Sequence, residues 1–426
     1  MSNKVQAIRG MNDILPEDIN KWHHLENSFS RILQQYGYSE IRFPMVESTQ
    51  LFKRSIGEVT DIVEKEMYTF NDLNGDSLTL RPEGTASCVR SCIQHGLLHN
   101  QQQKLWYYGP MFRHERPQQG RYRQFYQIGV EALGITGVGI ELELIAMCKR
   151  LWHILGIDEH VSLEVNSLGS IEERNAYREQ LVAYFNEHFD VLDDDSKRRL
   201  SKNPLRILDS KNPTMKDLIS NAPKLLDALN EDSEQHFNAF CQGLDYLGIN
   251  YTVNQSLVRG LDYYGQTVFE WVTDKLGSQS TVCAGGRYDA LVEQIGGKHT
   301  PAVGLAMGAE RLLLLIDKVA ADRVVELTPD VYVITDGADT TLNFGLLLAE
   351  QLRTTFNQLD IHVNTSGGSF KSQFKKADKS GARLALILGS EEVSKQVVGV
   401  KDLRSKQEQQ SIPQAELEDF LHSYLQ

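Results

Sequence analysis

Long hydrophobic runs are absent from the 426-residue sequence, and its longest apolar blocks, such as 312–316, have the length of helix-core segments. A membrane-spanning helix needs about 20 consecutive apolar residues, so we expect no transmembrane segment. The amino-terminal stretch MSNKVQAIRGMNDILP also lacks the apolar core of a signal peptide and the Arg/Ser-rich composition of a transit peptide. These absences favour a soluble, cytoplasmic protein.

Cysteine is scarce, and its pattern excludes two kinds of site. The five residues are odd in number and scattered, without a C-x-x-C pair: Cys88, Cys92, Cys148, Cys241 and Cys283. No second ligand pair accompanies Cys88 and Cys92, which argues against a zinc site. Free buried thiols in a reducing compartment fit better than a disulfide framework. The glycine runs match neither the Walker A loop nor the dinucleotide fingerprint.

Positive charge is in the minority, with 44 Lys and Arg against 57 Asp and Glu and a net charge of −13. This balance argues against a protein that coats nucleic acid non-specifically, although local basic patches remain compatible with RNA contact. Hydrophobic content of 41% and charged content of 24% are typical of an ordinary globular protein. At about 150 residues a domain, the length predicts two or three domains.

The most informative stretch is 104–131, where two β-type runs flank a polar segment and predict a long hairpin. Its turn is rich in arginine: Arg113, Arg116, Arg121 and Arg123, with Glu115. Alternation divides the returning strand into two faces: Phe125, Gln127, Gly129 and Glu131 on one, Tyr126, Ile128 and Val130 on the other. We expect the second face to lie in the core. The first face suits a phosphorylated, hydrogen-bonding ligand, but the stretch also fits a surface hairpin with a solvated loop.

Two further stretches are candidates for ligand binding. The bend Arg81-Pro82-Glu83-Gly84-Thr85 precedes a predicted helix; it displays binding groups, or it is a plain turn in which Thr85 caps the helix. Arg311 falls in the first turn of a helix predicted to begin at Ala309, the unfavourable end for a cation. Either a bound anion or a salt bridge to Glu310 or another carboxylate explains this position.

The pattern changes twice along the chain. Residues 171–248 are helical and polar, which predicts a small insertion whose charge runs are solvated faces or nucleic-acid contacts. After a polar linker at 322–329, strands and helices alternate as in a compact α/β domain. Between 371 and 406 nine positive residues face four negative ones, a concentration that RNA contact requires. The sequence therefore predicts domains at 1–325 and 330–426.

Three features in this order resemble the signature motifs of class II aminoacyl-tRNA synthetases. The amphipathic helix predicted over 17–36, with a strand broken at Pro44, is similar to motif 1, the dimer-interface element. The hairpin from Phe112 resembles motif 2, and the run 304–311 resembles motif 3. Within the class, the stretches LVRGLDYY (257–264) and AGGRYD (284–289) are similar to two signatures of the histidyl-tRNA synthetase family.

The resemblance implies an α+β fold: a class II synthetase antiparallel sheet of six strands flanked by helices, the helical insertion, and a C-terminal α/β anticodon-binding domain. It implies that ATP activates L-histidine to histidyl-adenylate and that the histidine passes to the 3′ end of tRNA(His). It also implies a homodimer, and Mg²⁺ that accompanies ATP without a metal motif in the protein.

The family's site residues map onto this sequence by position. The resemblance assigns catalysis to Arg259 and Arg113, with Arg259 standing where other class II enzymes place a metal ion. It assigns histidine binding to Glu83, Thr85, Gln127, Glu131, Tyr263, Tyr264 and Tyr288. It assigns ATP binding to Arg113, Glu115, Phe125 and Arg311. It assigns contact with the tRNA acceptor end to Arg116, Gln118 and Arg121.

These residue types suit the chemistry. Attack of a carboxylate on an α-phosphate needs charge neutralisation and in-line positioning rather than a protein nucleophile, and arginine binds phosphate in a fixed fork. One alternative is a non-catalytic, histidine-sensing paralogue, the regulatory subunit of ATP phosphoribosyltransferase. Such subunits typically lack the catalytic arginines and the anticodon domain, both of which are present here. The other, a class II synthetase for another amino acid, disagrees with the two histidine-specific stretches.

Overall fold

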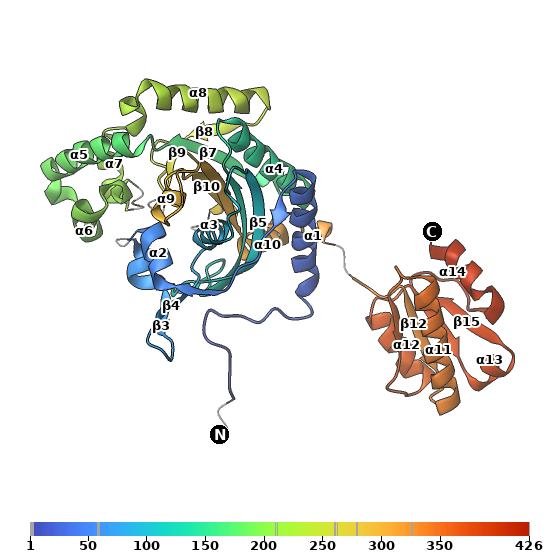
Figure 1. Cartoon of the computed structure of the whole chain (residues 1–426). Helices are drawn as coiled ribbons and strands as arrows, with labels where there is room; N and C mark the ends of the chain where they lie inside the picture. Colours follow the sequence, from blue (N-terminus) through green and yellow to red (C-terminus); the bar gives the residue numbers. More distant parts are fainter. Residues whose placement is uncertain are drawn as a thin grey trace. The chain divides into compact units, whose positions relative to one another are not determined.

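The computed structural model describes residues 4–57, 60–208, 210, 212–259, 261, 263–277, 280–324 and 327–425. The chain forms two compact units, Met1–Val325 and Glu326–Gln426, each with its own hydrophobic core (Figure 1). Among the described residues, no helix combines the length and the apolar character that crossing a membrane requires.

An eight-stranded sheet forms the centre of the first unit, in the order β1-β5-β6-β11-β10-β9-β7-β8 (Figure 1). Its strands are β1 (Ser39–Glu40), β5 (Gln103–Phe112), β6 (Gln124–Leu133), β7 (Ser162–Ser167), β8 (Tyr251–Val253), β9 (Gly265–Val272), β10 (Thr281–Arg287) and β11 (Ala302–Gly308). The six inner strands are antiparallel, which confirms the expected core of the sheet. The short edge strands β1 and β8 add to it in parallel and were not expected as members.

The predicted hairpin is the pair β5–β6, in register from Gln103 opposite Leu133 to Phe112 opposite Gln124. Ile128 and Val130 are fully buried, and Tyr126 packs partly buried against the same core, so the predicted core face is confirmed. Three helices cover this face: α1 (Ile19–Gln35), α4 (Gly139–Leu155) and α10 (Ala309–Val319). Phe125 and Gln127 therefore lie on the opposite side of the sheet.

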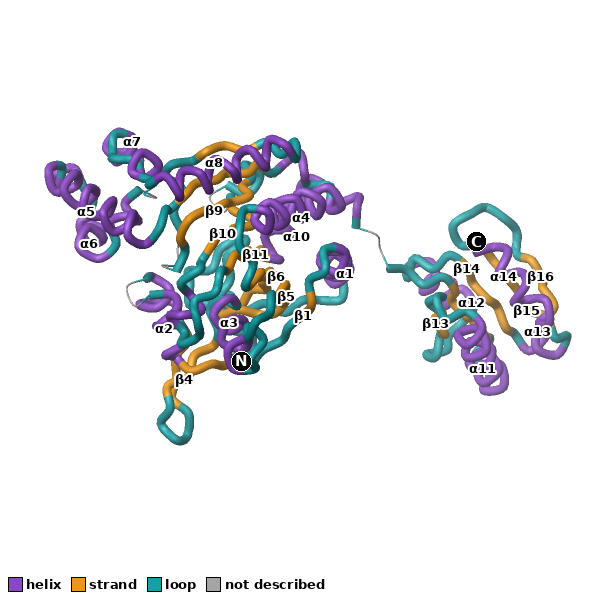
Figure 2. Tube along the Cα trace, turned by 45° about the horizontal axis from the view of Figure 1, so that its top comes forward, coloured by secondary structure: helices purple, strands orange, loops and turns teal. Residues whose placement is uncertain are grey.

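The opposite side carries α3 (Thr85–Gln94) and most of the helical insertion. The insertion contains α5 (Ile171–Glu187), α6 (Asp194–Lys202), α7 (Lys216–Ser220) and α8 (Glu231–Tyr246), with short 3₁₀ turns between them. Helices α5, α6 and α7 lie together at one side of the first unit (Figures 1 and 2), whereas α8 packs with α4 in the core on the other face of the sheet. Buried side chains of α5 and of the 3₁₀ turn η4 (Pro204–Ile207) belong to the same core cluster as Tyr264 and Tyr288. The insertion therefore forms a wall of the space above the sheet.

A small sheet, β2-β4-β3, flanks this space; its strands are β2 (Val46–Ser48), β3 (Tyr68–Asn71) and β4 (Ser77–Leu80). The strand expected to break at Pro44 is split between the two sheets, because β1 pairs with β5 and β2 pairs with β4. The helix α2 (Thr49–Ile56), a short π-helical turn at Ile62–Glu66 and α9 (Leu291–Gln294) complete this part of the unit.

The second unit is an α/β domain whose mixed sheet has the order β13-β12-β14-β15-β16. The strands are β12 (Val331–Thr335), β13 (Ile361–Val363), β14 (Leu384–Leu388), β15 (Val397–Asp402) and β16 (Gln410–Pro413). The helices are α11 (Asp339–Thr355), α12 (Phe370–Lys379), α13 (Ser390–Ser394) and α14 (Leu417–Leu425). The sequence did not indicate β16, because this short polar edge strand has no buried residue and therefore no apolar alternation.

Candidate active site

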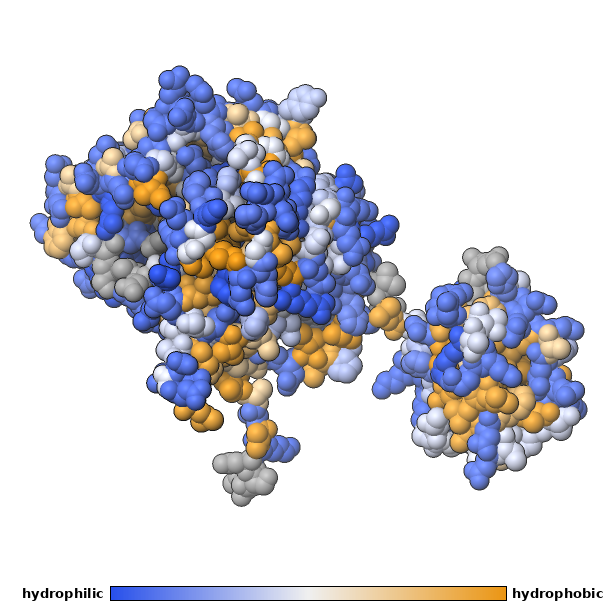
Figure 3. Space-filling model, viewed as in Figure 1, coloured by the Kyte–Doolittle hydropathy of each residue, from blue (hydrophilic) through white to orange (hydrophobic). Residues whose placement is uncertain are grey.

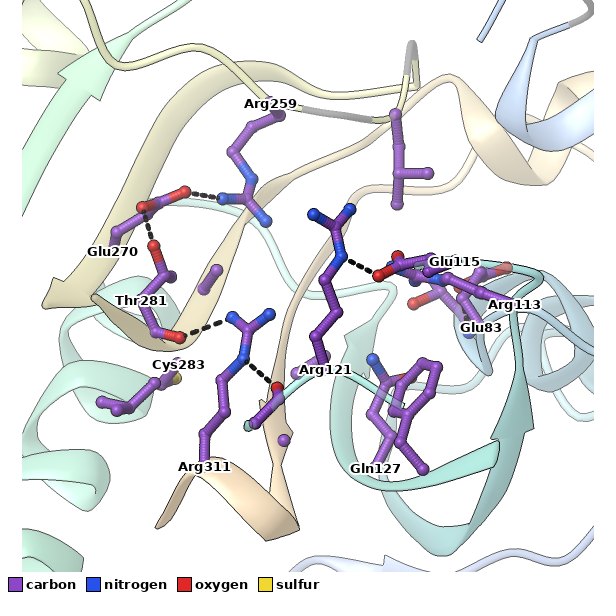
Figure 4. Close-up of a pocket in the computed structure, with 18 of the residues that line it drawn as sticks. Glu83, Arg113, Glu115, Arg121, Gln127, Arg259, Glu270, Thr281, Cys283 and Arg311 are labelled. Carbon is purple, nitrogen blue, oxygen red and sulfur yellow. Dashed lines mark hydrogen bonds and ion pairs between the residues drawn. The ribbon is translucent and has the colours of Figure 1, made fainter. Parts of the chain in front are cut away.

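A cavity of about 420 Å³, which we call the main cavity, lies on the side of the sheet away from α1 (Figure 4). Strands β6, β9, β10 and β11, the bend before α3 and the insertion contribute to its wall. Its described charged residues are five arginines and four glutamates: Arg113, Arg121, Arg206, Arg259, Arg311, Glu83, Glu115, Glu270 and Glu310. In Figure 4 the guanidinium groups of Arg121, Arg259 and Arg311 turn toward the same space.

Arg311 stands in the first turn of α10, as predicted. Its Nε donates to the carbonyl oxygen of Gly120 at 3.1 Å, and its Nη1 donates to that of Thr281 at 2.8 Å. Neighbouring Glu310 turns away, because its carboxylate accepts hydrogen bonds from the Tyr126 N–H, and burial raises its pKa to about 7. These two carbonyl acceptors fix the orientation of the Arg311 guanidinium group in the wall of the cavity.

Arg113 is held by two contacts on one side of the cavity. Its guanidinium carbon lies 5.2 Å from the centre of the Phe125 ring, and its Nε donates to the carbonyl oxygen of Pro82 at 2.8 Å. The ring on β6 and the Pro82 bend therefore fix the plane of the guanidinium group. This places Arg113 and Phe125 together, the two residues that the sequence predicts for the α-phosphate and adenine.

Arg259 is paired with Glu270, a residue that the sequence analysis missed. The two side chains form an ion pair, and Thr281 Oγ1 donates to the other carboxylate oxygen of Glu270 at 2.8 Å. The guanidinium carbon of Arg259 also lies 5.2 Å from the centre of the Tyr264 ring. One feature of the sequence could have identified Glu270, because it is a carboxylate within the apolar run TVFEWV. A charged side chain in a buried strand usually has a cationic partner.

The arginine-rich loop divides into two groups. Arg121 and Glu115 form an ion pair in the wall of the main cavity. Arg116 and Gln118 are exposed and lie outside the described lining of the cavity. The structure thus separates two residues that line the cavity, Arg121 and Glu115, from two that face solvent, Arg116 and Gln118. The roles predicted for all four residues stay predictions.

The bend at residues 81–85 differs from the simple turn that the sequence also allowed. Thr85 does not cap α3; instead, the Glu83 carboxylate accepts the N–H of Thr85 at 2.7 Å and that of Ala86 at 3.0 Å. Glu83 thus uses the helix N-terminus, where a carboxylate is favoured. The Thr85 hydroxyl is free to donate to Glu131 Oε1 at 2.8 Å. Both residues line the main cavity.

Glu131 is surrounded by hydroxyl groups beneath this end of the cavity. Besides Thr85, Tyr107 donates to Oε1 at 3.0 Å, and Tyr288 donates to Oε2. A side chain at Gly304 would overlap Oε2, so glycine is required there for the close approach of β11. Glu131 and Tyr288 are fully buried and are not among the lining residues, so their predicted contact with histidine stays a prediction.

Two aromatic residues and one amide complete the wall. Tyr263 and Tyr264 both line the cavity, with ring centres 4.7 Å apart, and each also contacts Tyr288. Gln127 lines the cavity, and its Oε1 has no hydrogen-bond partner within the described part of the chain. A ligand that brings an N–H group would satisfy this buried acceptor. Gly260 and Asp262 of the histidine-specific stretch lie outside the described residues.

The pKa of Glu131 has a testable consequence for stability. Burial raises it to about 8, although hydrogen bonds from Tyr288 and Thr85 lower it. The native protein therefore keeps a proton on Glu131 that the unfolded chain has lost above about pH 4.5. Because the native state binds more protons, this group makes the free energy of unfolding fall as pH rises from about 5 to 8.

Glu131→Gln removes this titration while keeping the side-chain shape. The unfolding free energy of the wild type minus that of the variant should decrease across this range, by at most about 1.4 kcal/mol per pH unit. Denaturant titrations at several pH values measure it, and a constant or increasing difference contradicts the raised pKa.

The described residues contain no group of three or more His, Cys, Asp or Glu side chains arranged to hold a metal ion. Magnesium usually binds through one or two carboxylates together with substrate phosphates. Glu270, at the wall of the main cavity, does not offer a vacant carboxylate for this role, because its two oxygens are bound by Arg259 and Thr281.

Comparisons with known proteins identify the family of this chain. The family model for histidyl-tRNA synthetase matches residues 10–312, and the model for the anticodon binding domain matches residues 330–424. A histidine–tRNA ligase from Legionella pneumophila (strain Philadelphia 1) is 64% identical over 423 residues and covers 99% of each chain. Its counterpart from the Lens strain is 63% identical over the same length, again with 99% of each chain covered.

Solved structures extend the likeness to the fold. Apo histidyl-tRNA synthetase from S. aureus is 35% identical, with a TM-score of 0.81 over 98% of this chain and 99% of that one. A Bacillus halodurans protein, described as an ATP phosphoribosyltransferase regulatory subunit/histidyl-tRNA synthetase, shares only the fold: 18% identity and a TM-score of 0.62 over 87% and 96% of the two chains. With both family models matched and 64% identity over nearly the whole length, this chain belongs to the histidyl-tRNA synthetase family.

Proposed function

We propose that the chain activates L-histidine with ATP, releasing diphosphate, and then transfers the histidine to the 3′ end of tRNA(His). The observation that carries this proposal is the composition of the main cavity. Its wall holds the oriented arginines Arg113, Arg259 and Arg311 together with Gln127, and the hydroxyl-bound Glu131 is buried beneath it. Such a cavity suits a triphosphate and a hydrogen-bonding ring together.

In the first step, a carboxylate oxygen of histidine attacks the α-phosphorus of ATP, and the bond to the β-phosphate breaks. We assign neutralisation of charge at the α-phosphate to Arg113 and Arg259, stacking of adenine to Phe125, and the γ-phosphate to Arg311, with Glu115 beside the nucleotide. Fixed cations of this kind stabilise the charge that develops in the transition state. Support comes from the contacts that orient Arg113 and Arg311 before any ligand is bound.

Recognition of histidine would rest on the other end of the cavity. We assign the amino group to Glu83 and Thr85, and the imidazole ring to Gln127, Glu131 and the tyrosines Tyr263, Tyr264 and Tyr288. A site built to pair with a polar ring leaves its own buried groups unsatisfied when an apolar analogue binds, and it rejects that analogue strongly. The unpaired Oε1 of Gln127 supports this assignment.

In the second step, a hydroxyl of the terminal ribose of tRNA(His) attacks the carbonyl carbon, and AMP leaves. We assign the acceptor end to Arg116, Gln118 and Arg121, supported by the exposure of the first two and the cavity position of the third. The anticodon end would contact the second unit, where positive residues outnumber negative ones between 371 and 406.

A cytoplasmic homodimer, with Mg²⁺ carried by ATP, belongs to the same proposal. Support for the dimer comes from large apolar side chains that are exposed in and beside the small sheet: Met45, Val46, Phe70 and Leu73. Figure 3 shows apolar side chains reaching the surface in the region where Figure 1 draws β3 and β4. A contiguous apolar surface of this kind is typical of an interface.

ATP–diphosphate exchange with each amino acid in turn tests the proposed function. We expect exchange with histidine at least about a thousandfold above that with any other amino acid, since a matched polar site rejects analogues by about 10⁴. No exchange with histidine, or faster exchange with another amino acid, would overturn the assignment. A histidine-sensing regulatory subunit would bind histidine in the same assay without catalysing exchange.

A further inference from the structure

The chain that precedes α1 is largely exposed, with one buried residue. Residues 4–18, all of which the structure describes, form no helix or strand and run to α1 as an irregular segment (Figure 1). We call this segment the N-terminal strap. Gly10 is the one buried residue within it, and the six residues before Gly10 are exposed. Gly10 is therefore where the strap is most tightly enclosed by the rest of the first unit.

Two backbone hydrogen bonds join Gly10 to the end of the arginine-rich loop, residues 113–123. The carbonyl oxygen of Gly10 accepts the N–H of Arg123 at 2.7 Å and that of Gln124 at 3.2 Å. Gln124 is the first residue of β6 and directly precedes Phe125 in the wall of the main cavity. The strap is thus bonded at the point where the loop passes into the strand that carries Phe125.

The residue at this end of the loop also fixes the loop's beginning. The carbonyl oxygen of Arg123 accepts the N–H of Arg113 at 2.9 Å, and Arg123 Nε donates to the carbonyl oxygen of Glu115 at 3.2 Å. Arg113 and Glu115 both line the main cavity. Arg123 therefore connects the strap to the backbone of two cavity residues, and a shift of Arg123 would move both of them.

Position 10 requires glycine for two reasons. Its φ is +86°, at the third position of a β-turn that the N–H of Met11 closes onto the carbonyl oxygen of Ile8 at 2.9 Å, and glycine adopts such a φ most readily. A Cβ atom there would also lie 2.7 Å from Cγ of Pro117 and 3.1 Å from Cγ of Arg123. Both arms of the loop therefore pack against the space that the missing side chain leaves.

We propose that Gly10 is a positioning residue for the reaction, through which the strap holds the arginine-rich loop in the geometry that ATP binding requires. The inference rests on the proposed function, which assigns Arg113, Glu115 and Phe125 to the nucleotide. Gly10 is not among the described lining residues of the main cavity, so it acts through Arg123 and the loop. A strap that merely covers the surface would leave ATP binding unchanged.

The test uses Gly10→Ala in the full chain, with Gly37→Ala as the matched control. Gly37, just beyond α1, has a φ of +77°, but a Cβ atom there would meet no atom of the described chain within 4 Å, its chain neighbours aside. Both variants place alanine at a positive φ, and only Gly10→Ala also presses on the loop. In ATP–diphosphate exchange, Gly10→Ala should raise the Michaelis constant for ATP about tenfold, since small displacements of binding groups are costly. The constant for histidine should stay within about twofold of wild type, and the control should keep both.

A double variant tests whether the loop contact is the cause. Pro117→Ala removes the Cγ atom that the new Cβ of Gly10→Ala would overlap. Gly10→Ala/Pro117→Ala should therefore bind ATP more nearly as Pro117→Ala alone does, because substitutions of residues in contact are not additive. Thermal unfolding of each variant verifies that the kinetics are measured on folded protein.

Three results would overturn the inference. One is an unchanged Michaelis constant for ATP in Gly10→Ala, including the case in which only the constant for tRNA(His) rises, which would assign the strap to the acceptor end. The second is an equal rise for ATP and histidine, which indicates general damage to the fold. The third is strict additivity in the double variant. Failure of the proposed function would appear separately, as absence of histidine-dependent exchange in the wild type.

Discussion

Replacing Arg259 by alanine is expected to abolish adenylate formation, lowering ATP–diphosphate exchange by about a thousandfold or more, the cost of removing one preorganised charge at a reacting centre. Arg259 lies in the wall of the main cavity, with its guanidinium oriented by Glu270 and by the Tyr264 ring. Without Arg259, the negative charge that develops at the α-phosphate in the transition state would no longer be balanced by a guanidinium group in this part of the cavity wall. Exchange measured at saturating ATP and histidine is the readout.

The stability of Arg259→Ala should change little. Its partner Glu270 has a side chain that is 17% exposed, keeps the hydrogen bond from Thr281 and borders a cavity that admits water. Arg259→Lys is the informative companion, because it keeps the charge but loses the planar fork. If Arg259→Lys recovers only a small part of the exchange activity, the planar guanidinium group, and not the positive charge alone, is what the reaction requires. Near wild-type exchange in Arg259→Ala would remove Arg259 from the catalytic step.

Replacing Glu131 by alanine should raise the Michaelis constant for histidine about a hundredfold and leave that for ATP nearly unchanged, because a buried polar group that loses its partner costs about 1–3 kcal/mol. The carboxylate lies at the histidine end of the proposed site, and its neighbours Thr85 and Tyr288 are oriented by it. Removing it leaves three hydroxyls without their acceptor, so histidine loses both a direct partner and an ordered wall.

Glu131→Gln separates these two effects, since an amide keeps the shape and one acceptor oxygen. If the direct contact matters, the glutamine variant should also require more histidine, but should unfold at nearly the wild-type temperature. Equal changes in the Michaelis constants for histidine and ATP in both variants would contradict a role for Glu131 in recognising the ring. Thermal unfolding of each variant is the necessary control, because Glu131 is fully buried.

Local patterns in the sequence were sufficient for much of the fold. The alternation along 124–133 correctly divided β6 into a core face and a cavity face, because successive side chains of a strand point to opposite sides. The spacing of apolar residues in 17–36 placed α1 to within about two residues. Arg311, singled out for its unfavourable position in the helix, lines the main cavity, and the bound anion that would explain the position stays a prediction.

Residues joined by long-range contacts escaped the same reasoning. Glu270 and Thr281 were not singled out, and neither was Tyr107, because each acts through a partner on another strand or turn. Strands were expected around Pro44 and at 251–258, but the sequence did not indicate that β1 and β8 join the large sheet in parallel, because the pairing partner lies in a distant segment. Of the two interpretations of the bend before α3, the capping role of Thr85 was wrong, because its hydroxyl donates to the distant Glu131 while Glu83 accepts the first N–H groups of the helix.

By itself, the sequence determined the order of the elements, the two units, the family resemblance and the arginines that surround the main cavity. The tertiary structure alone decided how the histidine end is built, since the donors to Glu131 lie 46, 24 and 157 residues away from it along the chain. The physical reason is range: periodicity and capping act within a few residues, whereas a binding site is assembled by packing between distant segments.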